Sequence, residues 1–277
     1  MVTVLRTPEK TYDLTKQTLV MGIVNITPDS FSDGGSYLEV DRAIKQAEKL
    51  EREGAHIIDI GGESTRPGHE PVSVEEELAR VIPAIQAIKQ AVHIPISIDT
   101  YKSKVAEKAV QAGASIINDV WGAIKDPEIA AVAARHDVPI ILTHNRTNRE
   151  YISLVDDVKK DLIKSINIAK KAGVKEENII LDPGVGFAKT QGDNLKIMRH
   201  LEDLHELGYP ILLGTSRKSF IGAVLDLPKE ERMEGTGATV CYGVSQGVEI
   251  VRVHDVEPIV RMTKMMDAMI GKGEENG

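Results

Sequence analysis

The stretch PISIDTYKSKVAEKAVQAGASIINDV, residues 95–120, holds two short apolar runs with one helical segment between them. The runs at 95–98 and 115–120 are rich in Ile and largely continuous rather than alternating, which indicates strands buried on both faces and hence a parallel sheet. Residues 102–112 between them have helical periodicity, and Gly113 stands where such a helix would end. The stretch therefore predicts a strand, a helix and a second, parallel strand.

The same unit recurs along the chain. Short apolar runs lie at residues 19–26, 56–60, 95–98, 115–120, 139–142, 178–181, 210–213 and 249–253. Stretches of helical period between them lie at residues 41–53, 74–89, 102–112, 127–135, 155–172 and 194–207. Eight strands alternating with helices in 277 residues fit a single α/β domain, a closed (β/α)8 TIM barrel, better than a doubly wound open sheet. We expect a short N-terminal extension at 1–17 that forms a hairpin, the barrel at 18–271 and a polar tail at 272–277.

Composition and charge exclude several classes of protein. The chain has 34 Lys and Arg against 42 Asp and Glu, a formal charge of −8. This acidic balance argues against nucleic acid or an anionic membrane as the main partner, although it allows a local basic pocket. The single cysteine, Cys241, permits no internal disulfide and no metal site built from cysteines, which suits a reducing compartment. No apolar run approaches the roughly 20 residues of a membrane span and no secretory signal opens the chain, so we expect a cytoplasmic protein.

A barrel of this kind carries its chemistry where each strand ends. Polar residues stand at these positions after every predicted strand. They include Asn25, Asp59, Arg66, Asp99, Asn118, Asp119, His144, Asp182, Lys218, Ser219, Arg252 and His254. Two connections at the same rim, at 27–38 and 63–72, are longer than the roughly 2–6 residues usual for such loops. Their Gly, Ser, Asp and Pro content suits loops that order over a ligand.

One group of rim residues predicts an anion site. Arg66, Lys218, Arg252 and His254 follow strands that are near neighbours around a closed barrel, so they can converge on one anion. Two linked phosphates suit their spread better than a carboxylate does, and four solvated surface charges are the plainer alternative. Asn25 lies beside them and could offer its carbonyl to a Mg²⁺ held mainly by phosphate and water. An asparagine that caps its own loop is equally consistent with the sequence.

Asp99, Asn118 and Asp182 form a second group. Buried carboxylates need hydrogen-bond donors, so these side chains suit a neutral heterocycle rich in N–H groups, such as a 2-aminopyrimidine edge. Structural hydrogen bonding is the alternative, above all for Asn118. Strand alternation predicts that Asp59 and Asp119 point away from this group. The sequence holds no G-x-S-x-G nucleophile motif and no histidine-rich rim that would bind a catalytic metal.

Several long motifs, in this order, resemble those of dihydropteroate synthases. They are NITPDSFSDGG at 25–35, GGESTRPG at 61–68, DPGVGF at 182–187, SRKSF at 216–220 and VRVH at 251–254. The similarity covers nearly all of the chain. It implies a homodimeric (β/α)8 enzyme that joins 4-aminobenzoate to 6-hydroxymethyl-7,8-dihydropterin diphosphate in folate biosynthesis. The products would be 7,8-dihydropteroate and diphosphate, and sulfonamides would compete with the aminobenzoate.

The resemblance also implies roles for single residues, which agree with the two groups above. The pterin ring would be held by Asp99, Asn118, Asp182 and Lys218. The Mg²⁺ would be bound by Asn25, and the diphosphate by Arg66, Arg252 and His254, with Thr65 also at that substrate. The aminobenzoate would be bordered by Phe187, Pro67 and Ser219, with Asp33 and Phe31 closing over the site. The catalytic groups would be Lys218, Asp33 and Arg66.

One residue departs from the family pattern, because Thr143 stands where the family commonly has Met. This alters the wall of the pocket without removing a charged group. Apolar residues of the last helical stretch, Ile259, Met262, Met266 and Met269, could serve a dimer face or the barrel itself.

The predicted reaction is a dissociative, SN1-like substitution without a covalent enzyme intermediate, because the arylamine is a poor nucleophile. Two other functions compete with it. A methyltetrahydrofolate domain of a corrinoid methyltransferase shares the Asp and Asn ring contacts but has no need of the STRP and SRKS loops. A pterin-binding homologue without activity should have lost Arg66, Lys218 or Arg252, and all three are present.

Overall fold

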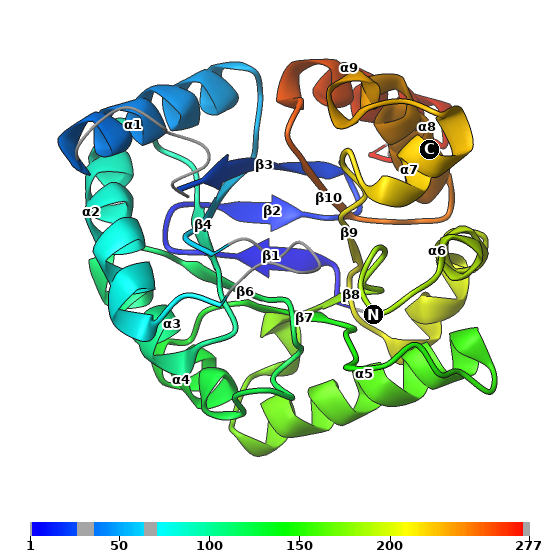
Figure 1. Ribbon diagram of the computed structural model, residues 1–277, viewed down its shortest axis with the longest axis horizontal. Helices are drawn as coiled ribbons and strands as arrows, with labels where there is room; N and C mark the ends of the chain where they lie inside the picture. Colours follow the sequence, from blue (N-terminus) through cyan, green and yellow to red (C-terminus); the bar gives the residue numbers. More distant parts are fainter. Residues whose placement is uncertain (1, 27–35, 64–70, 274–277) are drawn as a thin grey trace.

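The computed structural model describes residues 2–26, 36–63 and 71–273, and in this part of the chain eight parallel strands curve into a nearly closed barrel (Figure 1). The strands are β3 (Leu19–Asn25), β4 (Ile57–Gly61), β5 (Ile96–Asp99), β6 (Ile116–Asp119), β7 (Ile140–Thr143), β8 (Ile179–Asp182), β9 (Leu212–Leu213) and β10 (Ile250–Val253). Neighbours follow the order β8-β7-β6-β5-β4-β3-β10-β9, and a parallel bridge between Leu181 and Ile211 joins the two ends. The predicted barrel is confirmed.

Helices surround the barrel on the outside (Figure 1). They are α1 (Ser36–Arg52), α2 (Val74–Ala91), α3 (Ser103–Ala112), α4 (Glu128–His136), α5 (Leu154–Lys171), α6 (Gln191–Met198), α7 (Ser219–Leu225), α8 (Met233–Ser245) and α9 (Val256–Met269). Apolar side chains between strands and helices form one large buried cluster that includes Ile58 of β4 and Ile85 of α2. Because the outward side of each strand packs on helices and the inward side on other strands, both faces of the sheet are buried.

A short antiparallel hairpin precedes the barrel, as predicted. It consists of β1 (Val4–Arg6) and β2 (Thr11–Asp13), which lie across the barrel in Figure 1. Leu5 and Tyr12 of the hairpin belong to the buried cluster that fills the inside of the barrel with the first inward residues of the strands, such as Met21 and Ile57. The Tyr12 hydroxyl donates to the carbonyl of His56, with 2.6 Å between the oxygens. The hairpin therefore closes the end of the barrel where the strands begin.

The helix predicted at 194–207 is wrong as a single helix. Its place is taken by α6, which starts earlier behind a capping box of Thr190 and Asp193, and by a separate 3-10 helix at Glu202–Leu207. Buried residues of both segments, such as Ile197 and Leu204, keep an apolar spacing across the break. Periodicity alone could not detect the interruption, because the same face stays buried on both sides of it.

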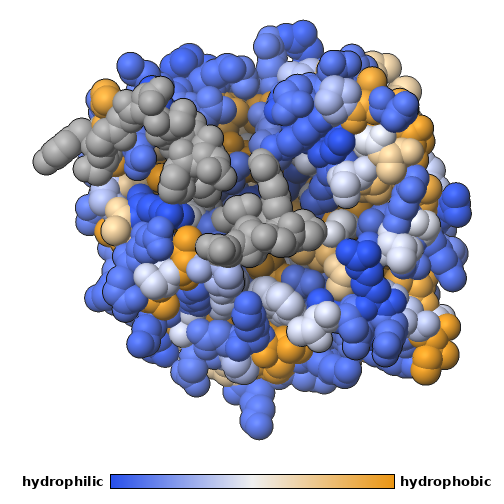
Figure 2. Space-filling view, in the orientation of Figure 1, coloured by the Kyte–Doolittle hydropathy of each residue, from blue (hydrophilic) through white to orange (hydrophobic). Residues whose placement is uncertain are grey.

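The face of the molecule in Figure 2 is mainly hydrophilic, with separate hydrophobic patches near its edges. Among the helices of the described residues, none combines the length and the apolar character needed to cross a membrane.

Candidate active site

The register of the sheet brings the polar ends of the central strands to one level. Asp99 pairs with Asn118 across β5 and β6, and Gly61 of β4 pairs with Asp99. Thr143 of β7 pairs with Asp182 of β8. Asp99, Asn118 and Asp182 are all buried. The structure therefore gathers the second predicted group, the one proposed for a heterocycle, at one rim of the barrel.

Arg252 of β10 connects this group across the barrel. Its Nε donates to Oδ2 of Asp59 and its Nη2 to Oδ2 of Asp99, each at 2.6 Å. The Asn118 amide also donates to Asp59 Oδ2, at 3.2 Å. The prediction that Asp59 points away is wrong, because Ile57 two residues earlier faces the barrel interior and side chains two apart in a strand share a face.

Asp119, in contrast, does point away from the rim group, as predicted. Its two carboxylate oxygens accept hydrogen bonds from the backbone N–H groups of Trp121, at 2.8 Å, and Ala123, at 2.6 Å. Burial nevertheless raises the pKa of Asp119 to about 7. Asp119 thus orders the turn after β6 and takes no place in the pocket.

The carboxylates beside Arg252 offer hydrogen-bond acceptors to a ligand. One oxygen of Asp59 and one of Asp99, Oδ1 in both, is buried without a hydrogen-bond partner among the described residues. Burial raises the pKa of Asp99 to about 7, although attraction to Arg252 opposes the rise. Burial also opposes the charge on Arg252, but attraction to Asp59 and Asp99 outweighs it and raises the Arg252 pKa. A bound N–H donor would satisfy an oxygen that the free protein leaves unpaired.

Lys218 lies directly before α7 and reaches over the segment that follows β8. Its Nζ donates to the carbonyl of Val185 and lies 4.6 Å from the ring centroid of Phe187. Burial lowers the Lys218 pKa to about 8, while attraction to Asp182 opposes the fall. A Cβ atom on Gly186, whose φ is +89°, would lie 2.8 Å from Lys218 Cδ. The glycine of the DPGVGF motif therefore allows the lysine to pass close to this segment.

Asp182, at the end of β8, lies next to Lys218. Its Oδ1 accepts a hydrogen bond from the Gly184 N–H at 2.7 Å. Burial raises the pKa of Asp182, and the charge of Lys218 opposes the rise. A Cβ atom on Gly214 would lie 3.8 Å from Asp182 Oδ2 and 3.9 Å from Lys218 Nζ, so both groups border this glycine of the rim.

His254 is a neutral hydrogen-bonding group in this site rather than a cation. Its Nδ1 lies 2.9 Å from Oγ of Ser216, which also accepts from the His254 backbone N–H. Burial, followed by repulsion from Arg252 and Arg217, lowers the His254 pKa to about 3. Ser219, which was predicted to border the aminobenzoate, is exposed at the start of α7. Because His254 is neutral, the group predicted to bind an anion has fewer positive charges than its residue types suggested.

Asn25 ends β3 beside the acidic group. A Cβ atom on Gly61 would lie 3.7 Å from Asn25 Oδ1 and 3.7 Å from Asp99 Oδ2. The Asn25 side chain makes no hydrogen bond to another described residue, and the loop that it would cap in its alternative role lies outside the described residues. No cluster of His, Cys, Asp and Glu that could hold a metal occurs among the residues described. One amide oxygen fits Mg²⁺, which keeps most of its ligands as water and phosphate oxygens.

Five of the predicted site residues lie outside the described residues. They are Phe31, Asp33, Thr65, Arg66 and Pro67.

A buried lysine that the sequence analysis missed lies behind the DPGVGF motif. Lys189 is 4% exposed, and its Nζ contacts Nδ1 of His144 at 2.9 Å and the carbonyls of Gly184 and Phe187 at 2.9 and 3.2 Å. His144 Nε2 in turn faces Asp161 Oδ2 at 3.3 Å. The signal in the sequence was the position of Lys189, two residues after Phe187 of the motif. A lysine in a buried segment needs hydrogen-bond partners.

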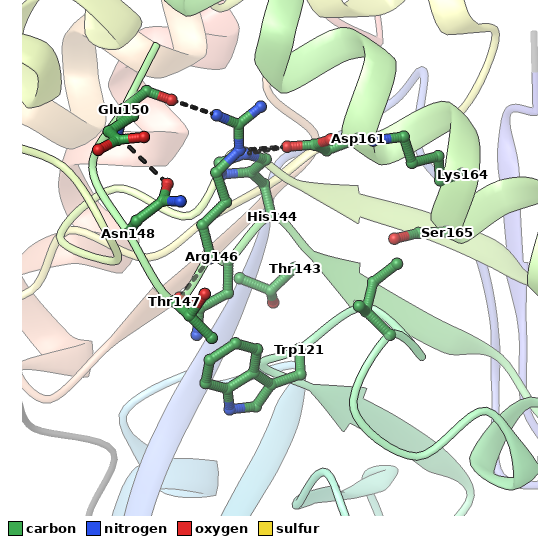
Figure 3. A pocket seen from close by; sticks show the side chains of 12 residues that line it. Trp121, Thr143, His144, Arg146, Thr147, Asn148, Glu150, Asp161, Lys164 and Ser165 are labelled. Carbon is green, nitrogen blue, oxygen red and sulfur yellow. Dashed lines mark hydrogen bonds and ion pairs between the residues drawn. The ribbon is translucent and has the colours of Figure 1, made fainter.

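A cavity of about 380 Å³ opens beside the end of β7 (Figure 3). Trp121, Thr143 and His144 line it, and Arg146 joins Asp161 to the carbonyl of Glu150 at its upper side in the view. Thr143, the residue that departs from the family pattern, is buried, and its hydroxyl has no hydrogen-bond partner among the described residues.

Comparisons with known proteins identify the family of this chain. The family model of pterin binding enzymes matches residues 21–254. The chain is 61% identical to the dihydropteroate synthase of Bacillus subtilis over 98% of this chain and 95% of the relative. A solved Clostridium difficile dihydropteroate synthase, determined in the presence of pteroic acid, has a TM-score of 0.91 and 50% identity, covering 93% of this chain and 98% of the other.

A second solved structure is the dihydropteroate synthase of Xanthomonas albilineans with 4-aminobenzoic acid. It has a TM-score of 0.92 and 39% identity, and the match covers 98% of this chain and 99% of the other. The family model and the relatives therefore agree on the family that the motifs indicate. This chain belongs to the dihydropteroate synthases, within the family of pterin-binding enzymes.

Proposed function

We propose that this chain joins 6-hydroxymethyl-7,8-dihydropterin diphosphate to 4-aminobenzoate and releases 7,8-dihydropteroate and diphosphate. One observation carries the proposal. In a chain of this family, buried carboxylates with unpaired oxygens lie at the same rim as Lys218 and Arg252. This combination suits a substrate with a donor-rich ring at one end and linked phosphates at the other.

The pterin ring is assigned to Asp99, Asn118, Asp182 and Lys218. The unpaired Asp99 oxygen supports this assignment, since the N–H groups of an aminopyrimidine edge are the donors that it lacks. Asp182 has one oxygen committed to Gly184, which leaves the other for the substrate. A ring bound between these side chains and Lys218 would be held in one orientation, with its methylene directed toward the rim.

The diphosphate is assigned to Arg252 and His254, together with Thr65 and Arg66. Arg252 uses Nε and one N–H of Nη2 for Asp59 and Asp99, so Nη1 and the second N–H of Nη2 are the donors that remain for an anion. His254 would contribute a hydrogen bond rather than a charge. Asn25 would hold a Mg²⁺, which when bound would supply positive charge to the leaving diphosphate.

The proposed reaction begins when the bond between the pterin methylene carbon and the diphosphate oxygen breaks. The electron pair of that bond leaves with the diphosphate, where Arg66 and Arg252 stabilise the developing negative charge. The positive charge left on the methylene is shared by the electron-rich ring. The aminobenzoate nitrogen then donates its lone pair to the methylene carbon and loses a proton, so no covalent enzyme intermediate forms.

The aminobenzoate is assigned to the border formed by Phe187, Pro67 and Ser219. Lys218 lies over the face of the Phe187 ring, so the two assigned substrate regions meet at this pair of side chains. The loops that carry Phe31, Asp33 and Arg66 would exclude water, which would otherwise compete with the weakly nucleophilic arylamine for the cation. Holding both reactants in one geometry supplies much of the remaining rate gain.

We also propose one catalytic domain over residues 18–271, a cytoplasmic location, a homodimer, and no nucleic-acid or membrane partner. Exposed apolar side chains on α7, α8 and α9 support the homodimer. They are Val224, Leu225, Tyr242, Met265 and Met269. Within α9, Ile259 is buried against the barrel, whereas Met269 is 61% exposed and remains available to a second copy. Exposed apolar side chains that gather on neighbouring helices are a feature of subunit interfaces.

The decisive experiment incubates the purified protein with the dihydropterin diphosphate, 4-aminobenzoate and Mg²⁺ and follows dihydropteroate by chromatography. We expect product that requires both substrates, and a strong loss of turnover in Lys218→Ala and Asp182→Ala. Binding of the pterin without turnover would contradict the proposed synthase. Near-full turnover in the two variants would contradict the assigned pterin site and leave the synthase activity standing.

A further inference from the structure

Lys189 is a buried amine whose hydrogen-bonding capacity is fully used inside the protein. An ammonium group has three N–H donors and no acceptor. Three acceptors lie within reach of Lys189 Nζ, namely the carbonyls of Gly184 and Phe187 and Nδ1 of His144, at 2.9, 3.2 and 2.9 Å. A buried cation without such partners would be strongly unfavourable, so these contacts define its position.

The contact with Lys189 also determines the tautomer of His144. Burial lowers the pKa of Lys189 to about 7, while attraction to Asp182 opposes the fall. In its charged form the lysine only donates, so Nδ1 of His144 then accepts and the ring proton lies on Nε2. Nε2 faces Asp161 of α5 at 3.3 Å, and Asp161 is itself held by Arg146 Nε at 2.5 Å and Lys164 Nζ at 2.8 Å. Burial lowers the His144 pKa to about 4, consistent with a neutral ring. A continuous chain of hydrogen bonds thus runs from α5 to the segment after β8.

The segment at 184–187 is packed too tightly to move without breaking these contacts. A Cβ atom on Gly184 would lie 1.9 Å from the carbonyl oxygen of His144. The Gly186 N–H donates to Asn194 Oδ1 at 2.6 Å, and the Phe187 N–H donates to the Gly184 carbonyl at 3.0 Å. Lys218 contacts the same segment through the Val185 carbonyl. The segment is therefore held by Lys189 on one side and contacts Lys218 on the other.

We propose that Lys189 is a positioning residue of the synthase: through His144 and Asp161 it holds segment 184–187 so that the Phe187 ring lies beneath Lys218. Its kinetic consequences rest on the proposed function. The Phe187 carbonyl accepts a hydrogen bond directly from Lys189, whereas the backbone of Asp182 is held by its pairing in β8 and only its Oδ1 contacts the segment, at Gly184. Loss of Lys189 therefore weakens binding of the aminobenzoate more than binding of the pterin.

The test replaces the amine with a side chain of similar length that cannot donate. In Lys189→Met, we expect the KM for 4-aminobenzoate to rise about tenfold and the KM for the pterin diphosphate to change less than about threefold. Lys272→Met is the matched control, because Lys272 is a partly buried lysine that contacts Thr18 at the opposite end of the barrel. This control should leave both KM values unchanged.

Two variants of His144 separate positioning from packing. In His144→Asn, an amide oxygen can still accept the Lys189 hydrogen bond, so we expect a KM for aminobenzoate close to that of the unmodified protein. In His144→Leu, no acceptor remains, and the KM should rise as it does in Lys189→Met. Equal KM values in these two variants would overturn the proposed role of the contact.

Hydrogen exchange provides a readout that does not need turnover. Backbone N–H groups of Gly184 and Phe187 should exchange about tenfold faster in Lys189→Met, while those of α5 keep their protection. Unchanged exchange at the segment would overturn the proposal, as would a lower melting temperature with both KM values unaltered. Absence of dihydropteroate synthesis by the unmodified protein would refute the proposed function alone, and exchange would still decide whether Lys189 holds the segment.

Discussion

Arg252 and Asp99 face each other across the barrel rim, with Nη2 of the arginine donating to Oδ2 of the aspartate at 2.6 Å. The same guanidinium donates to Asp59 through Nε, so one arginine is shared by two buried carboxylates. Planar guanidinium groups suit this arrangement because their donors lie in fixed directions. The pairing organises the proposed pterin end of the site and leaves Nη1 of Arg252 without a hydrogen bond to another described residue.

Arg252→Met should therefore damage both stability and activity. Two buried carboxylates would lose their counter-ion, and breaking a buried pair in this way costs about 3–5 kcal/mol. We expect kcat/KM for the pterin diphosphate to fall at least about 100-fold, because a charge assigned to the leaving group is lost with the site geometry. Arg252→Lys is the control: it keeps a charge but cannot bond both carboxylates, so it should restore only part of either property. Denaturant titration and steady-state kinetics measure the two effects, and full activity in Arg252→Met would contradict the assignment.

Thr143→Val should be neutral or slightly stabilising in the ligand-free protein. The Thr143 hydroxyl is buried without a partner among the described residues, so its replacement by a methyl group removes a desolvated polar atom at nearly constant volume. We expect the free energy of unfolding to stay the same or rise by up to about 1 kcal/mol. Thr236→Val is the matched control, because the Thr236 oxygen accepts from the Arg217 N–H at 3.0 Å, and this variant should be destabilised. A clear loss of stability in Thr143→Val would mean that its hydroxyl is satisfied in solution.

Lys102→Met should be among the most destabilising single changes. Lys102 Nζ contacts Glu63 and Glu77, each at 2.5 Å, and the Val72 carbonyl at 2.8 Å, so it ties both ends of the connection between β4 and α2. Removing it leaves two buried carboxylates together, and we expect a cost of about 3–5 kcal/mol in urea unfolding. Lys175→Met provides the contrast, because the Lys175 ion pair with Asp137 is exposed and should contribute little. Similar stabilities for the two variants would contradict this ranking.

The pH dependence of stability should contain a contribution from His56, far from the rim. Its Nδ1 accepts the Val20 N–H at 3.0 Å, and burial lowers its pKa from 6.5 to about 4. The folded protein binds a proton at His56 less tightly than the unfolded chain does. The contribution of neutral His56 to stability is therefore present above about pH 6.5 and is lost as the pH falls toward 4. The free energy of unfolding falls by roughly 3 kcal/mol at most over this pH range.

His56→Asn isolates this contribution, since an amide oxygen can accept the Val20 N–H but does not titrate. The free energy of unfolding, measured with a chemical denaturant, should differ less between pH 7 and pH 4.5 in the variant than in the unmodified protein. An identical difference in the two proteins would show that His56 is not buried as a neutral ring.

Much of the fold and part of the site could be predicted from local sequence. Each strand is an apolar run that ends in a polar residue, and the barrel rule then assigns Asp99, Asn118 and Asp182 to one rim. The interruption between α6 and the following 3-10 helix escaped prediction, because the buried spacing of residues such as Ile197 and Leu204 continues through it. Local patterns report which residues are buried more reliably than where the backbone changes its hydrogen bonding.

The inward direction of Asp59 illustrates a second limit. The sequence shows that side chains alternate between the two faces of β4. Which of the two sets of residues faces the barrel interior depends on the register with β3 and β5. A choice that is wrong by one residue sends the side chain to the opposite face. The same register brings Arg252, from a strand near the end of the chain, into contact with Asp59.

By itself, the sequence determined the eight strands, most of the helices between them, the hairpin, the motifs of the family and the residue types available at the rim. Only the tertiary structure decided that Arg252 joins Asp59 to Asp99, that His254 is neutral and that Lys189, His144 and Asp161 form one chain of hydrogen bonds. These features need groups that are distant in sequence to meet inside a low-dielectric interior, where burial and neighbouring charges outweigh the ordinary pKa of each side chain. Composition and periodicity carry no record of those distances.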